Sequence, residues 1–154
     1  MTKNNFANLL GQSPVIDESL ESFEHTFVGF GNGDGGILTM VMHPFNGTRS
    51  KKTMRIVRLK EQRKVALELA NASETDVELS EDEEIEKMLV DADMRTAMIL
   101  SGCIDSWNLM QDGEPVEFSR ENAQAMLFEV ESIRVETDRE MTKRGKTVTE
   151  IETA

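Results

Sequence analysis

The sequence predicts an α+β fold that is mainly helical, with an N-terminal antiparallel β-hairpin followed by about four helical segments. Near the N-terminus, two runs rich in aromatic and β-branched residues, 23–30 and 37–45, flank a glycine-rich loop. After Ser50 the apolar residues instead recur at helical spacing. The chain has 154 residues, which suits one domain over 1–154.

The composition limits the classes of function. The formal net charge of −12 argues against nucleic-acid binding, which needs a cationic surface, and against an anionic membrane surface. No apolar run approaches the roughly 20 residues that span a bilayer, and the N-terminus has no signal-peptide apolar core. A single cysteine, Cys103, excludes an intrachain disulfide. We therefore expect a soluble cytoplasmic protein without nucleic-acid or membrane partners.

The loop GNGDGG, residues 31–36, has three interpretations. Its glycines match the dinucleotide-binding pattern, but that pattern needs a helix directly after the glycines, and here a β-prone run follows. A calcium loop fails because Phe30 and Val41 stand at two ligand positions. A hairpin loop fits best, because glycine supplies the positive φ that tight turns need. We therefore expect no cofactor here.

A first helix is predicted from Ser50 to about Ala72. Its inner face would hold five apolar residues: Ile56, Leu59, Ala66, Leu67 and Ala70. The segment is also basic, with eight of the seventeen cations: Arg49, Lys51, Lys52, Arg55, Arg58, Lys60, Arg63 and Lys64. Either the acidic run that follows, 73–86, neutralises these cations, or they contact an acidic partner. Arg55 and Arg58 are the candidate residues for such a contact.

A second helix is predicted from about Glu81 to Ser106, and Trp107 would end it. Ser80 and Glu83 form a capping box at its start, and the acidic first turn suits the helix dipole. Its inner face would hold five apolar residues: Ile85, Met88, Leu89, Ala92 and Ile99.

The next segment predicts a turn and a third helix. Asp112-Gly113 is a tight-turn signal, and Pro115 fixes an extended segment. Ser119 is a good N-cap for the helix that follows. The inner face of this helix would hold Ala123, Met126, Leu127 and Val130.

A fourth helix is expected over about 132–144, with Gly145 ending it. The last residues, 146–154, read as a frayed tail, and 1–20 as a loose N-terminal arm.

Catalytic candidates are few. Cys103 lies inside the predicted second helix, where a buried, inert thiol is the common case. The alternative is a catalytic or metal-binding pair with His25 or His43. The scattered carboxylates are expected to form a solvated surface. We therefore expect no catalytic site, no metal and no enzyme activity.

Trp107 and Phe118 bracket the predicted helix–loop–helix corner. One interpretation is a structural staple, in which the indole closes one helix onto the next and Phe118 fills the corner. The other is a partner-binding pocket centred on Trp107, with Met126 and Leu127 beside it, because exposed Trp is enriched in binding hot spots.

This corner resembles that of the tail assembly chaperones of long-tailed bacteriophages. The resemblance covers about 30 residues, with a Trp, an Asp-Gly turn, a "pV-F-S-x-E-N" stretch and a Leu-rich helix. The matching residues are Trp107, Asp112, Gly113, Pro115, Val116, Phe118, Ser119, Glu121, Asn122, Met126 and Leu127.

The resemblance implies a non-enzymatic role in the host cytoplasm. Such chaperones keep the tape-measure protein soluble, help to recruit tail-tube subunits and are absent from the mature virion. The composition is compatible with this role, because a net charge of −12 favours solubility and ten methionines could line an adaptable groove. A structural neck or tail-completion protein of the virion is the alternative, and homo-oligomerisation remains open.

Overall fold

The computed structural model describes residues 21–31, 36–71 and 79–153, and the fold is α+β, as predicted. The elements are β1 (Phe23–Gly31), β2 (Ile37–Met42), α3 (Thr48–Ala70), α4 (Glu81–Gly102), β3 (Ile104–Trp107), β4 (Met110–Gln111), β5 (Glu114–Pro115), α5 (Arg120–Glu129) and α6 (Glu131–Thr153). The predicted N-terminal arm, 1–20, lies outside the described residues, as do 72–78 of the acidic segment.

The β-hairpin is confirmed, and a third strand extends it. β1 and β2 pair antiparallel, with Phe27 opposite Leu38, and β3 pairs with the other edge of β2, with Trp107 opposite Met40. The predicted hairpin loop lies largely outside the described residues, since 32–35 are not described.

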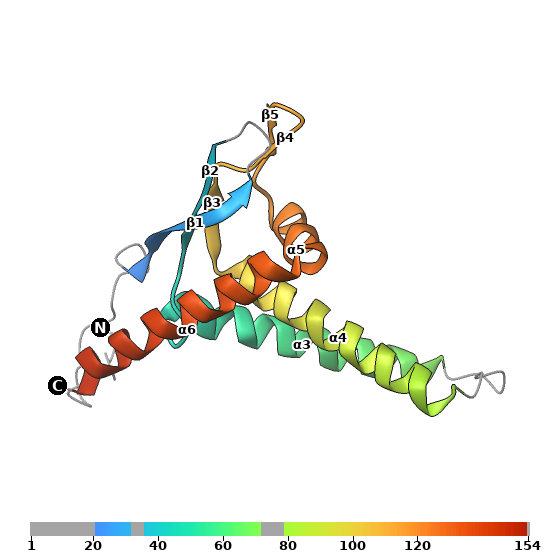
Figure 1. Cartoon of the computed structure of the whole chain (residues 1–154). Helices are drawn as coiled ribbons and strands as arrows, with labels where there is room; N and C mark the ends of the chain where they lie inside the picture. Colours follow the sequence, from blue (N-terminus) through green and yellow to red (C-terminus); the bar gives the residue numbers. More distant parts are fainter. Residues whose placement is uncertain (1–20, 32–35, 72–78, 154) are drawn as a thin grey trace, which may run out of the picture.

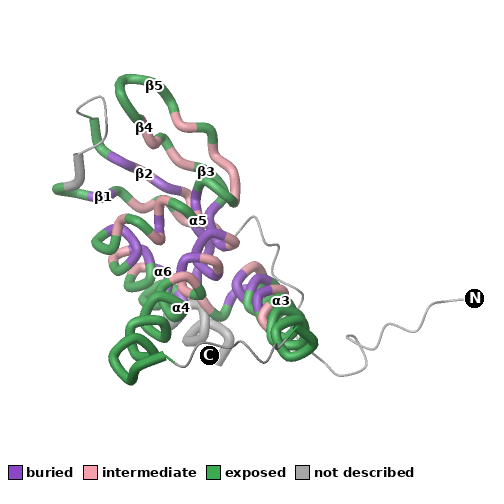
Figure 2. The backbone as a smooth tube through the Cα atoms, turned by 90° about the vertical axis from the view of Figure 1, so that its right-hand side faces the viewer, coloured by how far each residue is buried: buried purple, intermediate pink, exposed green. Residues whose placement is uncertain are grey.

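The core lies between one face of this sheet and the helices (Figures 1 and 2). Strand residues supply bulky side chains at alternate positions, so one face of the sheet is apolar. The fully buried residues of the core cluster are Phe27, Met40, Met42, Ala97, Leu100, Cys103, Leu127 and Met141.

The second helix ends earlier than predicted. α4 stops at Gly102, and the chain turns at Cys103 into β3, so the prediction that Trp107 ends a helix is wrong. The reason is tertiary: β3 pairs with the edge of β2 that β1 leaves unpaired. The His43 N–H also donates to the Cys103 carbonyl oxygen at 2.7 Å. Residues 104–107 therefore form a strand against β2, because tertiary context decides the structure of such a short segment.

The start of the third helix follows the prediction. Asp112 and Gly113 have φ of 52° and 81°, which makes the tight turn between β4 and β5. The Ser119 side chain accepts a hydrogen bond from the Asn122 N–H at 3.0 Å and so caps α5. On the inner face, Ala123 and Leu127 are fully buried, and Met126 and Val130 pack against the core.

The fourth helix does not stop at Gly145. α6 continues to Thr153, over most of the segment predicted to be a frayed tail. At Gly145 the helix passes so close to the Phe45 carbonyl that a side chain would overlap it. Glycine serves this close approach and does not end the helix, because one glycine inside a helix costs only about 1 kcal/mol.

The predicted inner faces of the first two helices are largely wrong. On α3 the buried residues are Ser50, Thr53 and Val57, whereas Leu59 and Leu67 are more than half exposed. On α4 only Ile99 of the five predicted residues is buried, and Ile85, Met88, Leu89 and Ala92 are exposed. Both helices extend past the body of the protein, which the sheet, α5 and α6 form with the base of the two helices (Figure 1), and residues 62–71 and 79–93 of their far ends are exposed.

Candidate functional site

The far ends of α3 and α4 form a two-helix projection, residues 58–70 and 81–95. Residues 62–71 and 79–93 are all exposed, as the green segments of Figure 2 show. Surface helices of a monomer normally bury one face. The projection therefore leaves the side chains of both helices accessible to solvent.

A cleft of about 480 Å³ runs between the two helices of the projection. Its apolar lining comes from four side chains: Val65, Ala92, Met94 and Met98. Its charged lining comes from Lys60, Glu61, Lys64, Glu68, Lys87, Asp91 and Arg95. Apolar surface with a charged rim is the usual composition of a partner-binding groove, and methionine adapts to varied side chains.

One ion pair crosses the cleft. Arg95 Nε lies 2.8 Å from Glu61 Oε1, and the two side chains are 54% and 40% exposed. An exposed pair of this kind contributes at most about 1 kcal/mol. The pair therefore links α3 to α4 across the cleft but adds little to the stability of their packing.

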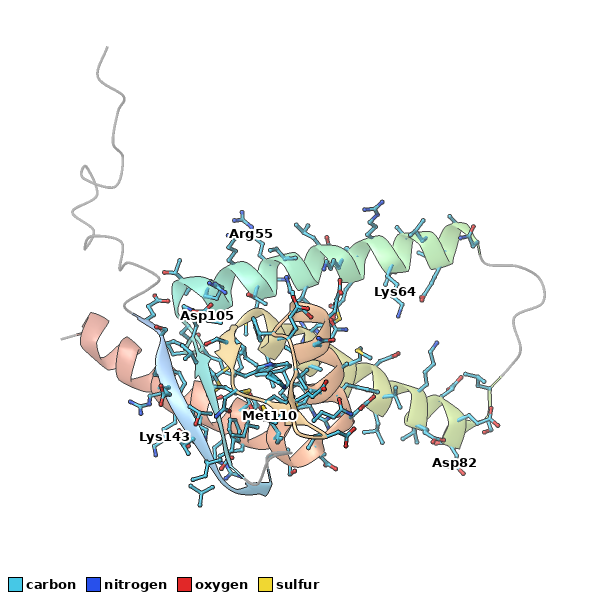
Figure 3. All side chains as sticks on the ribbon, turned by 90° about the horizontal axis from the view of Figure 1, so that it is seen from above. Arg55, Lys64, Asp82, Asp105, Met110 and Lys143 are labelled. Carbon is cyan, nitrogen blue, oxygen red and sulfur yellow. The ribbon has the colours of Figure 1, made fainter. Side chains whose placement is uncertain are left out.

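The projection separates the charges of the chain along its length (Figure 3). Thr53 lies opposite Gly102, and Glu61 lies opposite Arg95, so the helices run antiparallel. The acidic first turns of α4 at 81–86 therefore lie beyond Lys64, towards the free end. Among the described residues no ion pair joins these carboxylates to α3, which leaves the predicted internal neutralisation without support here.

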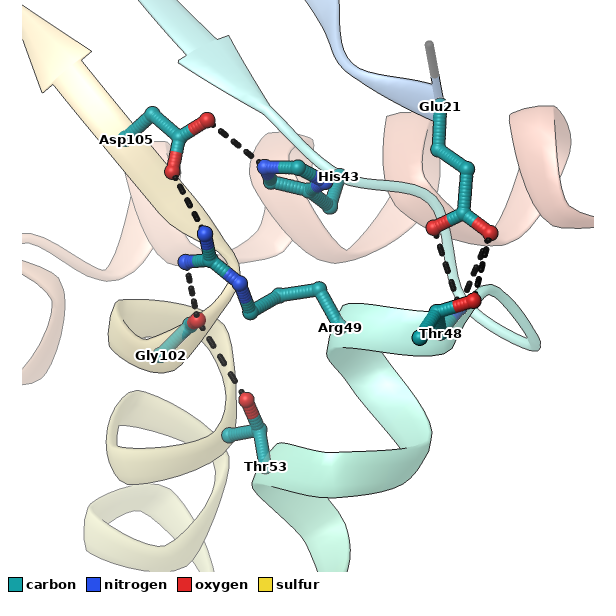
Figure 4. A network of polar contacts seen from close by, with 7 residues as sticks. All are labelled: Glu21, His43, Thr48, Arg49, Thr53, Gly102 and Asp105. Carbon is teal, nitrogen blue, oxygen red and sulfur yellow. Dashed lines mark hydrogen bonds and ion pairs between the residues drawn. The ribbon is translucent and has the colours of Figure 1, made fainter. Parts of the chain in front are cut away.

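Polar contacts fix the base of the projection to the sheet (Figure 4). Asp105, on β3, lies 3.1 Å from Arg49 of α3 and 2.6 Å from His43 Nε2. His43 is almost fully buried, and the Thr53 hydroxyl donates to the Gly102 carbonyl oxygen at 3.3 Å. These contacts set the direction in which α3 leaves the body.

Glu21 adds a cap at the start of α3. Gly47, the N-cap residue, has no side chain for this purpose. The Glu21 carboxylate instead accepts the Thr48 N–H at 2.9 and 3.0 Å and the Thr48 hydroxyl at 3.0 Å. A carboxylate there also interacts favourably with the helix dipole.

Trp107 and Phe118 form the predicted aromatic corner, although Trp107 is on a strand. Their rings meet edge to face, with centroids 5.2 Å apart, and Trp107 Nε1 donates to the Val116 carbonyl oxygen at 2.8 Å. Both side chains are partly buried and pack against the core cluster. This geometry is that of a structural staple, which positions the loop before α5.

The other predicted partner-binding residues fall into two groups. Leu127 is fully buried and Met126 packs against the core cluster, so these residues belong to the body. Arg55 and Arg58 are exposed on α3. The structure therefore does not bring the six predicted residues together at one site, since four of them lie at or beside the corner, Arg58 lies on the projection and Arg55 lies nearer the base of α3.

Of the catalytic candidates, His43 and Cys103 meet through a backbone hydrogen bond, while the His43 ring pairs with Asp105. Cys103 is buried at the end of α4, and burial raises the pKa of its thiol to about 11. His25 lies on β1 and faces Glu136 and Glu140 of α6, at 3.7 and 3.8 Å. Within the described ranges, no group of three or more His, Cys, Asp or Glu side chains is arranged to hold a metal ion.

The sequence did not indicate the cleft, although a signal for it exists. Lys60, Glu61, Lys64 and Glu68 recur at the spacing of Thr53 and Val57, and this spacing marks the side of α3 that faces α4. A helix whose partner-facing side is charged does not pack tightly along that side.

None of the helices in the described part of the chain is long and apolar enough to cross a membrane. Comparison of the chain with family models, with curated proteins and with solved structures finds no match.

Proposed function

We propose that the chain is a non-enzymatic tail assembly chaperone of a long-tailed bacteriophage, which binds the tape-measure protein and helps to recruit tail-tube subunits. The observation that carries the proposal is the exposed two-helix projection with its methionine-lined cleft. The resemblance of the Trp107–Leu127 segment to these chaperones supplies the name of the client. The protein would act in the host cytoplasm and leave before the virion is complete.

The cleft suits an apolar helical client. A client helix can place apolar side chains three or four residues apart against Val65, Met94 and Met98, in a helix-in-groove mode. The flexible methionine side chains can repack around different side chains, which suits a long client with many similar segments. The charged residues around the cleft favour its hydration when no client is bound.

The charge of the chain suits the same role. The net charge of −12 resists self-aggregation, and a complex with an apolar client inherits this solubility. The chaperone therefore needs no chemical step, only a surface that binds the client reversibly until tube subunits replace it.

Binding to the tape-measure protein encoded by the same phage tests the proposal. Val65→Glu with Ala92→Glu places two carboxylates in the apolar lining of the cleft, at exposed positions. We expect affinity to fall by about tenfold or more, which corresponds to 1.4 kcal/mol, while the melting temperature stays near that of the unmodified protein. Co-purification and titration by interferometry measure the effect.

A matched control carries the same change elsewhere. Ala125→Glu with Val135→Glu adds two carboxylates at exposed positions of α5 and α6, and should bind the client normally. Equal loss in both variants would show that charge alone is responsible and that the cleft is not the site. Failure of the unmodified chain to bind the client, or its presence in purified virions at a fixed stoichiometry, would contradict the chaperone function and favour a structural neck or tail-completion protein.

A further inference from the structure

A separate pocket lies at the base of the projection, where α3, the end of α4, β3 and the start of α5 meet. Its volume is about 470 Å³, which is in the usual range for ligand-binding pockets. The residues that line it are different from those that line the cleft. We call it the base pocket.

The base pocket is positively charged, although the chain as a whole is acidic. Three cations, Arg49, Lys52 and Arg120, and one carboxylate, Asp105, line it, which leaves a surplus of two positive charges. Both oxygens of the Asp105 carboxylate are engaged, one with Arg49 at 3.1 Å and the other with the His43 ring at 2.6 Å. Within the residues that the structure describes, no ion pair joins Lys52 or Arg120 to a carboxylate.

Two of these cations converge on the end of α4. Arg49 Nη1 donates to the Gly102 carbonyl oxygen at 3.4 Å, beside Thr53 and Asp105 (Figure 4). A guanidinium nitrogen of Arg120 lies 3.1 Å from the position that a Cβ on Gly102 would occupy. The two guanidinium groups therefore approach the same residue from α3 and α5, before any ligand binds.

We propose that the base pocket binds an acidic segment of a partner protein. A Glu or Asp carboxylate of this segment would pair with Arg120 and Lys52, because the guanidinium group presents a fork of N–H donors that matches a carboxylate. A neighbouring apolar side chain would cover Ile56 and Phe118, which line the pocket and are partly buried. The proposal concerns the base of the projection and does not rest on the chaperone function proposed for the cleft.

The surroundings of the pocket favour a carboxylate over a phosphate. Asp105 lies in the same pocket, and the C-terminal end of α4 carries the partial negative charge of the helix dipole. Both repel a doubly charged phosphate more strongly than a singly charged carboxylate. The net charge of −12 also repels a polyanion such as a nucleic acid.

The open edge of the pocket favours a side chain of a protein over a small molecule. Lys52 and Asp105 line the pocket and are exposed. Small-molecule sites usually bury most of the surface of their ligand. A side chain that enters from a bound protein needs less enclosure, because the partner covers the edge. Local cations on an acidic protein also orient an acidic segment through complementary charge.

Fluorescence anisotropy with labelled synthetic peptides tests the proposal on the full chain. The probes are short peptides in which Glu residues stand next to Leu or Phe, and the matched peptides carry Gln in place of Glu. We expect the Glu peptides to bind saturably, and more weakly as salt screens the charges. Binding should fall by about tenfold or more for the Gln peptides and for the Lys52→Gln, Arg120→Gln variant, because charge-assisted hydrogen bonds are lost.

The controls address charge, folding and the cleft. Lys51→Gln with Arg55→Gln removes the same charge at exposed positions of α3 outside the pocket, and should retain most of the affinity. Lys52→Gln alone changes one exposed side chain and should still weaken binding if Arg120→Gln lowers the melting temperature. The cleft variant Val65→Glu, Ala92→Glu should bind the peptides almost normally, which separates this proposal from the chaperone function.

Several results would overturn the proposal. One is the absence of saturable binding by the Glu peptides, and another is equal binding of the Glu and Gln peptides. A third is an equal loss of affinity in the pocket variant and in the Lys51→Gln, Arg55→Gln control. The last is a pocket that binds inorganic phosphate, or the small acid hydrocinnamate, more tightly than the peptides, which would identify a small-molecule site.

Discussion

Cys103 is fully buried at the point where α4 turns into β3. Its pKa rises from about 9 to about 11, because burial disfavours the thiolate more strongly than the contact with Thr53 and the nearby Arg49 and Arg120 favour it. Burial of this kind makes the thiol a poor nucleophile. The residue therefore acts as a small apolar core residue.

The raised pKa predicts a pH dependence of stability. Between about pH 9 and 11 the unfolded state loses the Cys103 proton while the folded state keeps it, so the free energy of unfolding falls as pH rises. The loss is at most about 3 kcal/mol for a shift of two units. Urea titrations of the unmodified chain and of Cys103→Ala across this range measure it. If both lose the same stability, the decline has another source.

Gly102 is required where α3 approaches α4. A Cβ at this position would overlap the Thr53 methyl group and lie 2.8 Å from Thr53 Oγ1 and 3.1 Å from the Arg120 guanidinium. Gly102→Ala should therefore destabilise the protein by about 1–3 kcal/mol, although alanine is the better helix former. Thr53→Ala makes room, so the double variant should lose less than the sum of the two single losses. An additive result in denaturant unfolding would contradict the steric explanation.

At the scale of elements, two helix caps of the same chemistry should differ in effect. Ser80 caps α4 on the exposed projection, accepting the Glu83 N–H at 3.3 Å, and Ser119 caps α5, which packs on the core. Ser119→Ala should lower the free energy of global unfolding by about 1 kcal/mol. Ser80→Ala should leave that value almost unchanged and instead speed amide exchange over 81–90, because an exposed helix end opens locally. Equal global effects would mean that the projection unfolds with the body.

At the scale of the whole molecule, the body and the projection should differ in stability. The body buries Phe27, Leu100 and Leu127, whereas residues 62–71 and 79–93 are all exposed. Hydrogen exchange followed by mass spectrometry at low protein concentration should show the projection exchanging well before β2 and α5, since little apolar surface holds it. Uniform protection of both parts at low concentration would contradict this division.

The sequence by itself determined the features that depend on neighbouring residues. The caps at Ser80 and Ser119 and the turn at Asp112-Gly113 were predictable, because hydrogen bonds and φ preferences over four residues decide them. The β-hairpin was predictable from its two β-prone runs. The inner face of α5 was predictable too, because this helix packs along its whole length.

Only the tertiary structure decided where α4 ends, how far α6 continues and which sides of α3 and α4 are covered. α4 gives way to β3 because β3 pairs with the edge of β2 that β1 leaves unpaired. Gly145 lies inside α6 because the helix passes so close to the Phe45 carbonyl that a side chain would overlap it. Helical spacing shows which apolar residues share a face but not whether anything lies against that face. The cleft and the charged sides of the projection depend on this last point, since they exist only because two helices extend together beyond the core.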